Sequence, residues 1–203
     1  MGNHCINCGA VNSEVDTFCA TCGSVLTTIP NGDALTGPQE PLFLYISVTR
    51  LILMSVASVG FYEAYWIYKN WKYINEREGR GLHPFWRGIF GVFFCHSLLG
   101  EIKKDKAASA LIEPSFSVHL ATGWVILTIL AEYIIGPFVP IPGIEVVIVM
   151  PSYLFFVPVQ KYINLVTEKR SPGAGYYGWS AGHIVCLILG LPSWAAIIFF
   201  LFQ

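Results

Sequence analysis

The segment SAGHIVCLILGLPSWAAIIFFLF, residues 180–202, sets the fold class of this chain. It contains no Asp, Glu, Lys or Arg, and the same is true of the whole block from Ser171 to Gln203. A helix that crosses the roughly 30 Å hydrocarbon core of a bilayer needs about 20 predominantly apolar residues. The segment therefore predicts a transmembrane helix and places the chain among integral membrane proteins.

The rest of the sequence continues this composition. The 203 residues are 54% hydrophobic and 12% charged, whereas soluble domains are about 25% charged. Further apolar segments cover about 51–68, 88–100, 118–135 and 144–160. The second of these has only 13 residues, so it is either a short crossing or a shallow segment. We expect an all-α integral membrane domain over residues 42–203, with four or five apolar segments.

Basic residues predict the orientation of these segments, because loops rich in Lys and Arg stay in the cytoplasm. Lys103, Lys104 and Lys106 mark the loop 101–117 as cytoplasmic, and the basic loop 161–178 is marked in the same way. The third and fourth apolar segments are then expected to form a hairpin that dips outward and returns. We expect a multi-pass protein of the cell inner membrane.

The basic segment 69–87 conflicts with this simple arrangement. If the N-terminus is cytoplasmic and 51–68 crosses once, the segment lies outside. Two solutions stay open: a bent hairpin over 42–75 that breaks near Gly60, or an N-terminus that faces outward. We expect the N-terminus to be cytoplasmic and leave the path of the first two apolar segments open.

Four cysteines form the pattern C-x2-C-x10-C-x2-C at the start of the chain: Cys5, Cys8, Cys19 and Cys22. Two C-x2-C pairs supply the four thiolates of a closed tetrahedral zinc site, and the loop between the pairs is long enough for a short hairpin. We expect a zinc ribbon over residues 1–25, with a structural Zn²⁺, followed by a flexible linker over 26–41. The alternatives are redox-active C-x-x-C pairs, which usually need a larger thioredoxin-like frame, and a disulfide hairpin, which needs an oxidising compartment.

Charge argues against a nucleic-acid partner for this ribbon. Residues 1–41 contain four acidic residues and no Lys or Arg, and the net charge of the chain is −1. Nucleic-acid binding depends on a basic surface. The N-terminus also lacks the basic and apolar pattern of a signal peptide, so we expect the internal segments to direct the chain to the membrane.

Polar residues in the apolar segments are the next candidates for function, because ionisable groups inside a membrane are costly. Glu63 is expected to pair with a basic residue of a neighbouring segment, with contact to an ion or a substrate as the alternative. Glu132 and Glu145 flank an uncharged turn, so we expect both at the outer interface. The pairs Cys95/His96 and His183/Cys186 could together bind a second metal; simple packing and helix hydrogen bonds are the expected alternative.

The sequence also contains an internal echo and an aromatic band. Lys72-Tyr-Ile-Asn75 recurs as Lys161-Tyr-Ile-Asn164, and Gly91-x3-Cys95 recurs as Gly182-x3-Cys186. A duplicated two-segment unit and chance recurrence at membrane interfaces both stay open. Aromatic residues interleaved with Lys and Arg over 66–87 predict anchoring at lipid headgroups.

Residues 61–100 carry a family resemblance. Phe61-Tyr-Glu-Ala-Tyr-Trp-Ile-Tyr-Lys-Asn-Trp71, Pro84-Phe-Trp-Arg-Gly88 and the run from Phe93 to Leu99 resemble an uncharacterised group of bacterial multi-pass inner-membrane proteins. Pro158-Val-Gln160 is similar too. The resemblance implies a helical membrane domain over roughly 45–203, to which the zinc ribbon is an addition. It implies no catalytic residues.

The sequence lacks common nucleophile and nucleotide-binding motifs such as Gly-x-Ser-x-Gly, Gly-x-Gly-x-x-Gly and the Walker loop. We therefore expect a non-enzymatic inner-membrane protein, a scaffold, adaptor or accessory subunit whose cytoplasmic zinc ribbon docks a protein partner. Lipid and a further copy of the chain are the other expected partners. The alternative is a small oligomeric transporter or channel.

Overall fold

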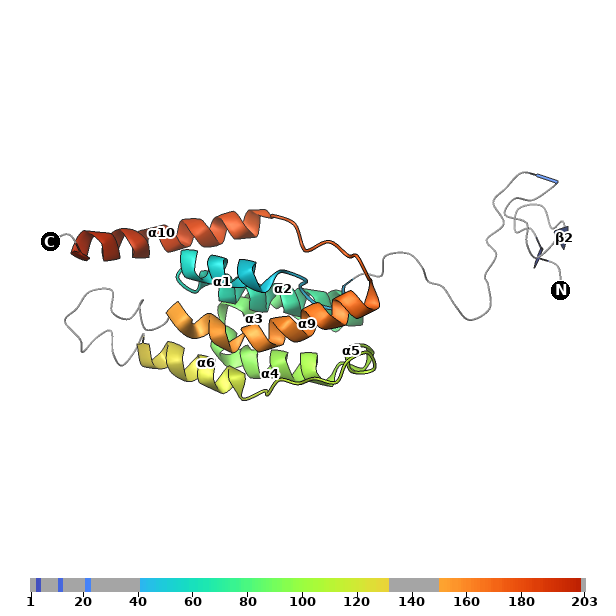
Figure 1. The fold of residues 1–203 in the computed structure, drawn as a ribbon, viewed down its shortest axis with the longest axis horizontal. Coiled ribbons are helices and arrows are strands. Elements are labelled where there is room, and N and C mark those ends of the chain that lie inside the picture. The colour runs from blue at the N-terminus through green and yellow to red at the C-terminus, as the bar shows by residue number, and fades with distance from the viewer. Residues whose placement is uncertain (1–2, 5–10, 13–20, 23–40, 132–149, 202–203) are drawn as a thin grey trace. The chain divides into compact units, whose positions relative to one another are not determined.

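The computed structural model describes residues 3–4, 11–12, 21–22, 41–131 and 150–201. The chain separates into two units, Met1–Gln39 and Glu40–Gln203 (Figure 1). The elements in chain order are β1 (Asn3–His4), β2 (Val11–Asn12), α1 (Val48–Ala57), α2 (Phe61–Glu78), α3 (Pro84–Ile89), α4 (Gly91–Lys104), α5 (Lys106–Ser109), α6 (Leu120–Ile129), the 3-10 helix η2 (Met150–Phe155), α9 (Val157–Arg170) and α10 (Ala181–Leu201).

The first unit contains a two-stranded antiparallel ladder. Asn3 of β1 pairs with Asn12 of β2, and His4 pairs with Val11. The two strands flank the first C-x2-C pair in the sequence. The loop between the two cysteine pairs is long enough for a short hairpin, and β2 lies within this loop whereas β1 precedes the first pair. The predicted linker, 26–41, lies outside the described residues except for its last one.

The first apolar segment is broken into a helical hairpin and does not form one helix. α1 ends at Ala57, and the turn that follows places Val59 at φ 52° and Gly60 at φ 87°. Glycine adopts positive φ without steric strain, and the Ser58 hydroxyl accepts the Tyr62 N–H at 2.9 Å, which caps the new helix. The sequence leaves the path of 51–68 open, and a single continuous helix over this range is not what the structure shows. The bend near Gly60, kept open from the sequence, is observed.

α10 packs against the α1–α2 hairpin through small residues. A Cβ at Gly182 would collide with the Tyr65 ring, and a Cβ at Gly190 would lie 2.7 Å from Ser58 Cα. Cys186 is buried between them, one turn from each, and its Sγ lies 3.8 Å from the Phe61 carbonyl oxygen. Small residues at a spacing of four allow two helices to approach closely in a membrane protein.

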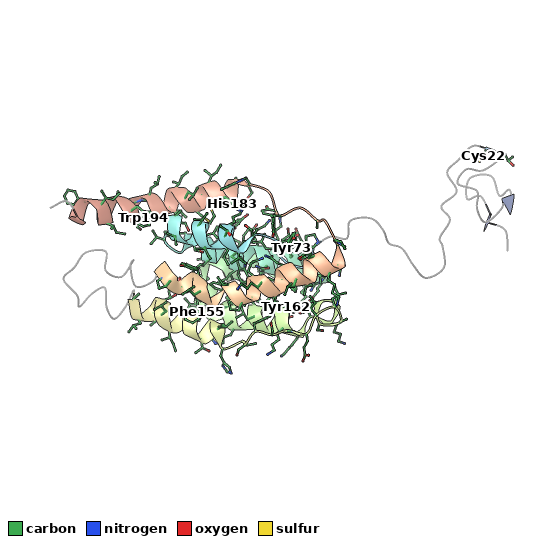
Figure 2. All side chains as sticks on the ribbon, viewed as in Figure 1. Cys22, Tyr73, Phe155, Tyr162, His183 and Trp194 are labelled. Carbon is green, nitrogen blue, oxygen red and sulfur yellow. The ribbon has the colours of Figure 1, made fainter. Side chains whose placement is uncertain are left out.

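The second half of α10 is also fixed to the end of α1. The Trp194 indole Nε1–H donates to the Ala57 carbonyl at 3.1 Å, and Figure 2 shows both Trp194 and His183 on this helix. The contact satisfies one of the carbonyl groups that a helix end leaves without an intrahelical partner.

The echo motif in α4 packs in a related way on another part of α2. A Cβ at Gly91 would lie 2.8 Å from Ile67 Cδ1, and Cys95 is buried. α6 covers this contact with Trp124, and a Cβ at Gly123 would collide with the ring of Phe155 from η2. Both glycine–cysteine motifs of the sequence therefore mark helix faces that pack on α2.

Three basic parts of the sequence meet at one end of the helical unit. Arg77 of α2 forms an ion pair with Asp105, and Arg80 pairs with Glu101 at 2.8 Å. Lys169 Nζ, at the end of α9, donates to the Leu111 carbonyl at 2.8 Å. We call this the basic end. The hairpin explains it, because the chain runs along α1, turns at Gly60 and returns along α2.

Across the described residues the second unit is all-α, as the sequence predicts, but only one helix there is long and apolar enough to cross a membrane, Ala181–Phe199. α1 and α6 are apolar and shorter. The segment 88–100 is interrupted at Phe90, where α3 ends and α4 begins. The described part of 144–160 starts as η2 and passes into α9 at Val157.

Candidate functional site

The predicted zinc ligands lie almost entirely outside the described residues. Cys5, Cys8 and Cys19 are outside the described residues, and Cys22 lies in an exposed turn over residues 21–22. Among the residues that the structure describes, no group of three or more His, Cys, Asp or Glu side chains could hold a metal ion. The zinc site stays a prediction from the cysteine spacing. Glu132 and Glu145 also lie outside the described residues.

Glu63 is the carboxyl group that the structure buries most clearly. It lies in the first turn of α2 with 2% of its surface exposed. The Trp124 indole N–H of α6 donates to Oε2, and the Ser152 hydroxyl of η2 donates to Oε1 at 2.6 Å. A buried carboxyl group is tolerated when donors satisfy its oxygens. Glu63 therefore joins three separate segments of the chain.

The basic partner that the sequence predicts for Glu63 is not among the contacts of its carboxyl group in the described residues. Both of the donors to its carboxyl oxygens are neutral, and no ion pair of Glu63 is seen within the described ranges. Neutral donors suit this position because a cation would add a second desolvation cost in the same interior. The carboxyl group keeps a titratable proton site inside the helical unit.

His183 forms a second polar cluster, at the start of α10. Its Nδ1 lies 2.9 Å from the Ser180 hydroxyl and accepts the Ser180 N–H at 3.1 Å. Its Nε2 lies 3.4 Å from the Tyr62 hydroxyl, and Ser180 Oγ also contacts the Tyr65 hydroxyl at 2.9 Å. These contacts fix the first turn of α10 on α2.

The second metal site considered from the sequence is not assembled. His96 Nε2 contacts the Thr122 hydroxyl at 2.7 Å on the α4–α6 side and is exposed, whereas His183 is buried against α2. Cys95 and Cys186 are both buried in helix contacts. The packing alternative describes both pairs.

Gln160 is the centre of a polar network that the sequence analysis missed. Its Oε1 accepts the Trp66 indole N–H at 2.6 Å. Its Nε2 donates to the carbonyl oxygens of Leu44 and Ile46 at 3.1 and 3.3 Å and to Asn164 Oδ1 at 2.7 Å. The one available signal was a polar side chain at the end of a long run without charges.

The network encloses residues 42–46, which lie outside any helix or strand and are all buried. Asn70 completes it, because its Oδ1 accepts the Leu44 N–H at 3.0 Å and its amide donates to the Trp66 carbonyl at 2.9 Å. Backbone groups outside regular structure need such partners when they are buried. The role of Gln160 and Asn70 is therefore to hold this segment between α2 and α9.

Cations stacked on aromatic rings lie along the predicted aromatic band. Lys69 Nζ lies 4.3 Å from the Tyr177 ring centroid and donates to its hydroxyl at 2.9 Å. The Arg87 guanidinium lies 4.2 Å from the Trp71 ring, and that of Arg50 lies 5.4 Å from the Trp179 ring. Such pairs are typical of a headgroup layer, where a ring and a charge share a wet interface.

At the basic end, acidic side chains balance part of the charge. The Arg80 guanidinium donates to Glu101, and this hydrogen bond lowers the pKa of the Glu101 carboxyl. Arg77 contacts both Glu78 and Asp105. Lys103 and Lys104 remain exposed beside this cluster.

Comparisons with protein-family models, with curated proteins and with solved structures give no match for this chain. The resemblance to the bacterial inner-membrane group therefore stays a prediction from the motifs around Trp71 and Trp86. The function has to be inferred from the geometry of the site itself.

Proposed function

We propose that the chain is a non-enzymatic inner-membrane adaptor or accessory subunit, anchored by α10, with its basic end and its N-terminal zinc ribbon in the cytoplasm. The observation that carries the proposal is the meeting of three basic segments, around Arg77, Lys104 and Lys169, at one end of the helical unit. A membrane protein keeps its Lys and Arg on the cytoplasmic side. The bend at Gly60 supports this orientation, because it allows 69–87 to lie on the same side as the other basic segments, which a single crossing by 51–68 would not.

α10 supports the membrane anchor. Its 21 residues are about 31 Å long at 1.5 Å per residue, which matches the hydrocarbon thickness. Only 17% of its most apolar window is buried inside the structure, and Ile188 and Leu191 are 58% and 62% exposed. The core helix of a soluble protein would be covered. An exposed apolar helix of this length fits a lipid environment.

The α1–α2 hairpin supports a shallow, re-entrant entry from the basic end. α1 has 10 residues, or about 15 Å, which is half of the hydrocarbon core. Non-helical backbone at membrane depth is tolerated where protein encloses it, and the network around Gln160 encloses residues 42–46 in this way. α6 and the described part of 144–160, which is η2 and the start of α9, are proposed as the arms of a second hairpin.

The ribbon supplies the docking function in this proposal. A closed site of four thiolates leaves no open zinc position for chemistry, and the acidic, Lys- and Arg-free residues 1–41 favour a protein partner. The test is Cys8→Ser, with Asn7→Ser as the matched control. We expect Cys8→Ser to lose zinc and to lose a purified partner that binds the parent and Asn7→Ser, while all three proteins remain in the membrane fraction. Equal binding by all three would refute docking through the ribbon.

The second candidate function is a small oligomeric transporter or channel, and Glu63 favours it. A buried carboxyl group bound only by neutral donors can serve as a proton or cation contact. Glu63→Gln should abolish any cation flux measured in proteoliposomes. Glu76→Gln, on the exposed side of the same helix, is the control. No flux in the parent under a proton or sodium gradient would exclude this candidate.

A further inference from the structure

An apolar groove of about 540 Å³ runs along the outside of the helical unit between α2, α3 and α10. This volume falls within the usual range for ligand sites, about 300–1,000 Å³. None of its lining residues is charged, and its walls include Ala64, Tyr65, Tyr68, Phe85, Val185 and Leu189. The polar clusters around Glu63, His183 and Gln160 assign no role to this groove.

The groove has a defined direction. α10 runs antiparallel to α2 here, because Cys186 contacts Phe61 while Gly182 contacts Tyr65. The end at Phe61 carries no side-chain hydroxyl and is lined by Phe61, Cys186 and Leu189, whereas the other end carries the phenol of Tyr68 beside Phe85. Beyond Tyr68, α2 continues into Lys69 and Lys72, towards the basic end. Along α2 the order is thus apolar, phenolic and cationic.

The two lysines leave a net positive charge at this end of the groove. Lys69 contacts the rings of Tyr73 and Tyr177 and the Tyr177 hydroxyl, with no acidic partner in the described part of the chain. Lys72 lies 3.5 Å from Glu76 in a solvent-exposed pair, and exposed pairs of this kind are weak. An anion at the Tyr68 end of the groove would therefore gain attraction from both.

We propose that this groove binds an anionic phospholipid of the surrounding bilayer, with an acyl chain between α2, α3 and α10 and its phosphate at Lys69 and Lys72. The proposal rests on the membrane position of α10 and is independent of the zinc ribbon. Phospholipids present charge, interface and hydrocarbon in the same order as the groove. Aromatic residues prefer the headgroup level, and lysines near the surface attract anionic lipid.

The experiment is native mass spectrometry of the full chain in mild detergent. The probes are palmitoyl-oleoyl phosphatidylglycerol, the corresponding phosphatidylcholine, and inorganic phosphate. Val185→Trp fills the groove, and Ile184→Trp is its control, because Ile184 is exposed on α10 and does not line the groove. Thermal unfolding of each variant in the same detergent checks that the fold is retained.

A second pair of variants tests the headgroup contact. Lys69→Gln/Lys72→Gln removes two charges at the groove, and Lys103→Gln/Lys104→Gln removes two charges at the end of α4. We expect phosphatidylglycerol to bind more tightly than phosphatidylcholine, and to lose about fivefold in affinity for each groove lysine removed. Val185→Trp should weaken both lipids, and both control variants should bind like the parent.

Several results would overturn the proposal. Equal binding of the two lipids, or binding that the groove variants leave unchanged, would show that the lipid lies elsewhere. A dimer without lipid adducts that Val185→Trp dissociates would assign the groove to a second copy of the chain. Binding of inorganic phosphate without lipid would reduce the site to a free-anion site. Recovery of the protein in the aqueous fraction without detergent would instead refute the membrane anchor, a separable outcome.

Discussion

Replacing Gln160 with Met tests whether the buried amide network holds residues 42–46 in place. Met has a similar volume but has neither the amide donor nor a strong acceptor. The change leaves the Trp66 N–H and the carbonyls of Leu44 and Ile46 without their partner, at three buried positions. Each buried unsatisfied group costs about 1–3 kcal/mol, so the sum is about 3–9 kcal/mol.

This cost is large against the total stability of a typical domain, about 5–15 kcal/mol. At about 2–4 °C per kcal/mol for a chain of this size, even the lower limit lowers Tm by about 6–12 °C. The assay is thermal unfolding in mild detergent, followed by the fluorescence of Trp66 and its neighbours. Thr167→Val is the control, because it removes one buried hydroxyl on the same helix that contacts only the Ile163 carbonyl at 2.9 Å. A difference of about 2 °C in Tm corresponds to roughly 1 kcal/mol. If the Tm of Gln160→Met lies within this difference of the Tm of Thr167→Val, the network does not stabilise residues 42–46.

Two further changes test the anchor and the basic end. Leu191→Arg places a charge on the exposed, apolar side of α10, at a cost of about 2.5–3.5 kcal/mol at the membrane centre. Alkaline carbonate should therefore release more of this variant from the membrane than of the control Leu191→Phe. Equal release of the two variants would contradict a spanning α10. Glu101→Gln should lower stability to urea at pH 7 and have a smaller effect at pH 3. The hydrogen bond from Arg80 lowers the pKa of Glu101, so the contribution is present above the unfolded pKa, near about 4.3, and is lost as the pH falls through the folded value. A loss of stability that is the same at both pH values would show that the charge of Glu101 is not the cause.

The last apolar helix was predictable because composition alone specifies it. A run of 23 residues without a formal charge, 180–202, leaves no other stable solution than burial in lipid or in a large core. The bend near Gly60 could be stated as an option, since glycine permits positive φ. The contact of Arg77 with Asp105 was not predictable, because it joins parts of the chain that are distant in sequence.

The partners of Glu63 were not predictable in the same way. A partner of opposite charge is the natural expectation for a carboxyl group among apolar residues. Trp124 and Ser152 are neutral, so no charge pattern in the sequence marks them as partners. They are 61 and 89 residues away in the chain. The Gln160 network was missed for the same physical reason: its hydrogen bonds are specified by packing, which is not periodic in sequence.

The enclosure of residues 42–46 also has a consequence for biosynthesis. Their partners are made much later, because Gln160 is 116 residues beyond Leu44, and Tyr177 donates its N–H to Tyr45. A ribosome completes domains from the N-terminus, so this segment emerges with unpaired backbone groups and stays without those partners until α9 and the residues before α10 are made. A chain that stalls before α9 therefore lacks the side chain that encloses residues 42–46 and leaves their backbone groups to other partners.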